Sequence, residues 1–100
     1  MELMLPTKRD LLEFIVKKIK ENLNSFNNHK FLVYDPLYDI HELAVITRVY
    51  LCDDNQYNAD SIVLCYDRYS SNCREQDEVV LSDLCYKQLL LLVVDYKQIY

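Results

Sequence analysis

The chain of 100 residues contains no glycine. Glycine adopts positive φ at almost no cost, so tight turns and close approaches of the backbone to a ligand usually depend on it. Its absence excludes the glycine-rich phosphate-binding loops of Walker A and dinucleotide-binding proteins. Collagen-like repeats and glycine–serine linkers are excluded as well. Left-handed positions in turns therefore have to be occupied by asparagine or aspartate, the next most tolerant residues.

Residues 1–100 have the length of a single domain. Hydrophobic residues make up 51% of the chain and charged residues 27%, which is typical of globular proteins and not of disordered chains. The most apolar run, residues 89–94, is far shorter than the roughly 18 residues that span a bilayer. The first residues lack the basic and long apolar regions of a secretory signal. We therefore predict one cytoplasmic domain with no membrane partner.

Charge is distributed unevenly along the chain. Residues 1–30 contain six basic and four acidic side chains, whereas residues 31–100 contain five basic and twelve acidic ones. The net charge is −5. Affinity for nucleic acid comes mainly from lysine and arginine contacts to phosphates, so we expect no nucleic-acid partner. A basic protein partner would be attracted by the same field.

The N-terminal third predicts an amphipathic helix over residues 7–25. Thr7 is a good N-cap residue, and Asp10 occupies the acidic position of a capping box. Lys17 and Lys20 lie on the polar face of this helix. The asparagines that follow can end it in the left-handed conformation. The apolar face is formed by Leu11, Leu12, Ile15, Val16, Ile19 and Leu23.

The middle of the chain predicts strands separated by polar turns. A short strand over residues 31–34 ends before Pro36, and a longer strand covers residues 41–52. Strict alternation in the longer strand predicts one covered and one open face, as in an antiparallel sheet. The partner strands are expected at residues 61–69 and 78–81, with polar loops at residues 53–58 and 70–76.

A second helix is predicted over residues 83–98, with Ser82 as its N-cap. Periodicity alone leaves open whether residues 89–94 are helix or buried strand. The element order α-β-β-β-β-α predicts an α+β domain. In this fold an antiparallel meander of three to four strands is covered on one face by the N- and C-terminal helices.

The four cysteines show no Cys-x-x-Cys spacing, which structural zinc sites usually contain. Cys52, Cys65 and Cys85 are interpreted as small, reduced, buried side chains. Cys73 falls in the predicted polar loop and is expected to be the most reactive thiol. We therefore predict neither a metal site nor a disulfide.

No pattern of catalytic residues is found either. The acidic segment 53–60 resembles a calcium loop only in composition, because Asn58 and Leu64 occupy the positions that need Gly and Glu. His29 and His41 have no nucleophile motif beside them. We predict no cofactor and no catalytic residue.

The second helix contains more apolar residues than one face needs. Cys85, Leu89, Leu92, Val93 and Tyr96 share the side expected to pack on the sheet. A further apolar group, interpreted as an interface, consists of Leu84, Leu90, Leu91 and Val94. The alternative is that these side chains are covered within the chain by residues 31–34 or 1–5.

The leading functional hypothesis is a non-enzymatic protein–protein interaction module that forms a homodimer. The nine tyrosines fit it, since tyrosine is common both in sheets and at interfaces. A small enzyme with an unrecognised site is a weaker alternative. The main alternative is an acidic inhibitor that imitates the charge of nucleic acid through Asp53, Asp54, Asp60, Asp67, Glu75, Asp77 and Glu78.

Overall fold

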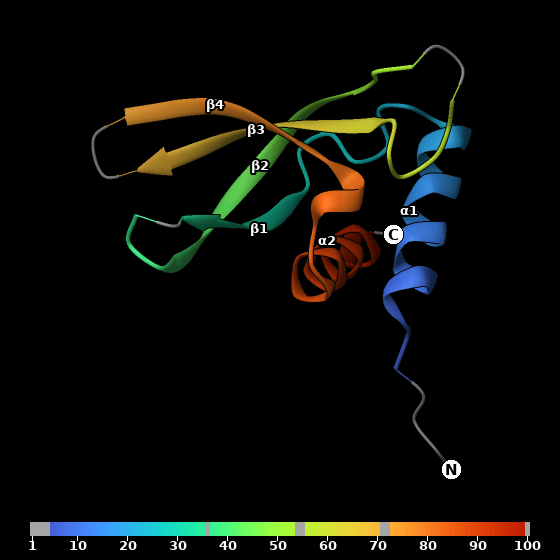
Figure 1. Ribbon diagram of the computed structural model, residues 1–100, viewed down its shortest axis with the longest axis horizontal. Coiled ribbons are helices and arrows are strands. Elements are labelled where there is room, and N and C mark those ends of the chain that lie inside the picture. The colour runs from blue at the N-terminus through green and yellow to red at the C-terminus, as the bar shows by residue number, and fades with distance from the viewer. Residues whose placement is uncertain (1–4, 36, 54–55, 71–72, 100) are drawn as a thin grey trace.

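The computed structural model describes residues 5–35, 37–53, 56–70 and 73–99 (Figure 1). A four-stranded antiparallel sheet in the order β1-β2-β3-β4 lies between two helices in the sequence, which confirms the α+β fold and the element order. The elements are α1 (Lys8–Glu21), β1 (Lys30–Asp35), β2 (Ile40–Leu51), β3 (Ile62–Ser70), β4 (Cys73–Val80), the 3-10 turn η1 (Leu81–Asp83) and α2 (Tyr86–Ile99).

The core lies between the helices and one face of the sheet. α2 packs against β1, and α1 packs against α2 (Figure 1). Leu11, Ile15 and Ile19 are the buried residues of α1. The other fully buried large side chains are Phe26, Phe31, Ile46, Ile62, Leu64, Leu81, Leu84, Leu89 and Leu92. Burial of this apolar surface is the main stabilising contribution.

α1 begins as the sequence predicts and ends earlier. Thr7 and Asp10 form the complete capping box. The helix was expected to reach residue 25, but it ends at Glu21. The Asn22 side chain accepts a hydrogen bond from the Asn24 amide, and local bonds of this kind compete with helical ones. The chain then turns so that Phe26 is fully buried.

β2 does not keep the strict alternation that the sequence suggests. Its pairing with β3 shifts register between Ile46 and Arg48, so Thr47 is an extra residue in a bulge. As a result Ala44 and Ile46 are buried before the bulge and Val49 after it. The prediction that one face carries every second residue of β2 was therefore wrong at this point.

The predicted loop at residues 70–76 is also shorter in the structure. β4 already begins at Cys73 and pairs with β3 up to Val80. The polar residues of β4 were interpreted as a loop. They are compatible with a strand because one face of the sheet is open to solvent. The side chain of Cys73 lies outside the described residues, so its predicted reactivity stays a prediction.

The second helix starts later than predicted. Residues 81–83 form η1, and Leu84 is extended and only 1% exposed. α2 begins at Tyr86, where the Gln88 side chain accepts a hydrogen bond from the Cys85 amide. Residues 89–94 are helical, which resolves the alternative of a buried strand. None of the helices in the described ranges is long and apolar enough to cross a bilayer.

The cysteine interpretation needs correction. Cys52 and Cys85 are exposed, and Cys65 is half-buried, so none of the three is a core residue. Cys52 follows the end of β2, and Cys85 precedes the first turn of α2. Both therefore lie where their elements leave the core. All three thiols are free.

Candidate functional site

The predicted interface on the second helix is divided by the structure. Leu84 belongs to the core, and Leu90 packs partly against it. Leu91 is half-buried, and Val94 is exposed. Leu84 therefore presents no apolar surface, Leu90 and Leu91 are each half-buried, and Val94 is the most exposed of the group.

α2 is hydrogen-bonded to β1 on both sides of Leu91 along the helix. One turn before Leu91, the Gln88 side-chain amide donates to the Leu32 carbonyl at 2.8 Å. One turn after it, the Asp95 carboxylate accepts a hydrogen bond from the Lys30 amide at 2.9 Å. α2 thus lies along the edge of β1, and the alternative that residues 31–34 cover the group stays a prediction. Residues 1–5 were the other segment proposed to cover this apolar group, and residues 1–4 lie outside the described part of the chain.

The larger apolar surface lies at the hairpin that joins β1 and β2. Leu37 is 80% exposed and Tyr38 is 68% exposed. The turn between β1 and β2 lies at the far end of the sheet from α1 (Figure 1). We call this surface the hairpin patch; it consists of Tyr34, Leu37, Tyr38, Ile40 and Leu43. Clustered exposed apolar residues usually mark an interaction surface.

Local hydrogen bonds fix the conformation of the hairpin. The Asp35 carboxylate accepts a hydrogen bond from the Leu37 amide, and Asp39 takes the left-handed conformation with φ 51°. The Tyr34 hydroxyl donates to the Asp39 carboxylate, which raises the pKa of Tyr34 above its usual value. Its ring also contacts that of His41. Asp39 therefore occupies the left-handed position that glycine often takes in a turn.

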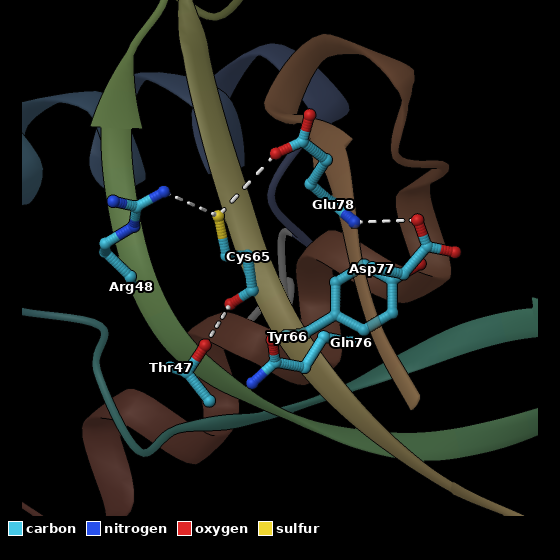
Figure 2. Close-up of a pocket in the computed structure, with 7 residues that line it drawn as sticks. All are labelled: Thr47, Arg48, Cys65, Tyr66, Gln76, Asp77 and Glu78. Atoms are coloured by element: carbon cyan, nitrogen blue, oxygen red, sulfur yellow. Dashed lines mark hydrogen bonds between the residues drawn. The ribbon is translucent and has the colours of Figure 1, made fainter. Parts of the chain in front are cut away.

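A shallow depression lies on the open face of the sheet, opposite the helices (Figure 2). Its volume is about 490 Å³, and its lining includes Thr47, Arg48, Cys65 and Glu78. The Cys65 thiol is 3.8 Å from a Glu78 carboxylate oxygen and 3.9 Å from the Arg48 guanidinium. The same Glu78 oxygen accepts a hydrogen bond from Tyr50 at 2.9 Å, which raises the pKa of that tyrosine.

The two histidines lie elsewhere. His29 is 4% exposed, and its Nδ1 atom is 3.0 Å from the Asp95 carboxylate. Its ring packs against those of Phe26 and Tyr96, so it is part of the core. His41 is exposed in the hairpin. In the ranges that the structure describes, no group of three or more His, Cys, Asp or Glu is placed to hold a metal ion.

Searches found no match. This holds for models of protein families, for curated proteins and for solved structures. The site is therefore interpreted from its geometry alone.

The carboxylates proposed to imitate nucleic acid are not equivalent. Asp67 is only 2% exposed, and Glu78 is hydrogen-bonded within the depression. Asp53, Asp60 and Asp77 are exposed. Asp54 and the side chain of Glu75 lie outside the described residues.

Chemically, the two surfaces differ. The depression offers a thiol, a carboxylate and a guanidinium on a surface open to water. The hairpin patch offers apolar area, which is favourable to bury. The patch was not predicted from the sequence, because Leu37, Tyr38 and Ile40 lie between the two predicted strands and belong to no periodic pattern. The available signal was the pair Leu37-Tyr38 between two aspartates.

Proposed function

We propose that this protein is a non-enzymatic protein–protein interaction module that associates with further copies of itself through the hairpin patch. One observation carries the proposal. Five large apolar side chains are exposed on the hairpin at one end of the sheet, with Tyr34 and Leu43 on its open face and Ile40 on the opposite face. Full burial of a leucine or tyrosine side chain stabilises an interface by roughly 1.5–3 kcal/mol.

A protein partner fits this patch better than an anionic membrane surface. Asp35 and Asp39 lie on either side of Leu37 and Tyr38. A net charge of −5 would also repel anionic lipid headgroups. A second chain can supply apolar surface and compensating positive charge together.

Two substitutions of matched exposure test the proposal. Leu37→Asp changes a patch residue that is 80% exposed, and Leu5→Asp changes a residue that is 77% exposed and lies outside the patch. Sedimentation equilibrium over a wide concentration range would measure association. We expect the wild type and Leu5→Asp to associate, and the dissociation constant of Leu37→Asp to be at least about tenfold higher. A wild type that stays monomeric, or equal behaviour of the two variants, would refute the proposed function.

A further inference from the structure

A second surface of the molecule has the complementary properties. A groove of about 480 Å³ lies between the outer face of α1 and the segment that contains Ala59. Leu12, Val16 and Ala59 provide its apolar lining, and each is half-buried. Figure 1 shows the chain between β2 and β3 passing beside α1 at this point. This groove is called the α1 groove below.

The α1 groove is bordered by positive charge. Arg9, Lys17 and Lys20 line it together with one acidic residue, Glu13. Arg9 and Glu13 form an ion pair with each other at 3.0 Å. Lys17 and Lys20 form no ion pair with any residue in the described ranges. The groove therefore presents an apolar surface next to two uncompensated positive charges.

The hairpin has the matching chemistry. Leu37 and Tyr38 are the most exposed apolar side chains of the patch, and Asp35 and Asp39 lie beside them. If two hairpins met each other, the aspartates of both copies would be brought together, which is unfavourable. If the hairpin met the groove, apolar side chains would contact apolar side chains and carboxylates would face lysines. Charge therefore favours the groove as the receptor for the hairpin.

The two surfaces lie at opposite ends of the molecule. The hairpin is on the left in Figure 1, and α1 is on the right. The molecule extends over 43 × 40 × 25 Å, so a hairpin cannot reach the groove of its own chain. A contact between them must join different copies. Such a heterologous contact leaves one free hairpin and one free groove, so it continues into a ring or a filament.

We propose that copies of this protein associate head to tail, with the hairpin of one copy bound in the α1 groove of the next. The proposal rests on the proposed function, because it takes the self-association as given and assigns the receptor surface. It replaces the homodimer interface predicted on the second helix with a directional contact.

Mixing two defective variants tests this arrangement. Leu37→Asp disables the hairpin and keeps the groove, whereas Lys17→Glu with Lys20→Glu disables the groove and keeps the hairpin. All of the substituted residues are exposed, so circular dichroism should show the wild-type fold. We expect each variant alone to be monomeric at concentrations where the wild type associates. An equimolar mixture should form dimers and nothing larger in sedimentation velocity, since only one competent hairpin–groove pair is available.

The control reverses the same number of charges outside the groove. Lys8→Glu with Lys87→Glu should associate like the wild type, because neither exposed lysine lines the groove. If the groove variant associates as strongly as this control, or if the mixture stays monomeric, the head-to-tail arrangement is refuted. Either result would still leave the proposed function supported, provided that the wild type associates and Leu37→Asp does not.

Discussion

The hydrogen bonds of Asp95 give the sharpest prediction of stability. This carboxylate, with a side chain 25% exposed, binds the His29 ring at 3.0 Å and the Lys30 amide at 2.9 Å. In Asp95→Ala the Lys30 amide can bind water, because Lys30 is exposed, so loss of this hydrogen bond costs about 1 kcal/mol of stability. His29 is 4% exposed and would keep an unpaired polar atom in the core, which costs about 1–3 kcal/mol.

Together these contributions predict a loss of about 2–4 kcal/mol, a large part of the 5–15 kcal/mol typical of a domain. The melting temperature should fall by about 10–30 °C. Urea unfolding would measure the free energy directly, with an unchanged m value showing that only stability has changed. Asp95→Asn keeps a hydrogen-bond acceptor, so its loss in free energy of unfolding should be less than half that of Asp95→Ala.

The matched control is Asp60→Ala, because Asp60 is exposed and its side chain makes no hydrogen bond within the described ranges. It should change stability by less than about 0.5 kcal/mol. A double-mutant cycle of Asp95→Ala with His29→Ala isolates the pair. If Asp95→Ala is no less stable than the control, or if the cycle shows no coupling, the assignment of Asp95 as the link between α2 and β1 is wrong.

Two further predictions concern pH and thiol chemistry. Burial raises the pKa of Tyr66 above 10.0, so its contribution is complete below about pH 10 and is lost as the pH rises through the folded-state pKa. Tyr66→Phe should therefore move the alkaline unfolding midpoint, followed by circular dichroism, to higher pH; no movement would contradict the assignment. In brief alkylation of the native protein followed by mass spectrometry, Cys52 and Cys85 should react before Cys65, since only Cys65 is half-buried. Equal labelling of the three would contradict their placement.

Patterns within single elements could be predicted from the sequence. The helical period and the capping box located the start of α1, and alternation located β2 and β3 to within a residue or two. The fold class followed from the order of these elements. Such patterns are local, because they depend only on which side of one helix or strand faces the core.

Features that depend on a neighbouring element could not be predicted in this way. The bulge at Thr47 is visible only in the pairing of β2 with β3. The late start of α2 results from burial of Leu84 against other elements. The contact of α2 with β1 joins Gln88 to Leu32, and the α1 groove needs Ala59 to lie beside Val16. Each of these contacts joins residues distant in the sequence.

The edges of the sheet bear on the proposed association, because both are obstructed to strand pairing. Open strand edges readily pair with other chains. On β1 the edge is covered by α2, through Gln88 and Asp95. On β4 the Glu78 amide donates to the Asp77 carboxylate at 2.8 Å, so a pairing strand would have to displace that bond and approach exposed acidic residues. With strand pairing disfavoured at these positions, the proposed association would use the hairpin patch and the α1 groove, and their opposite charges would give the contact a direction.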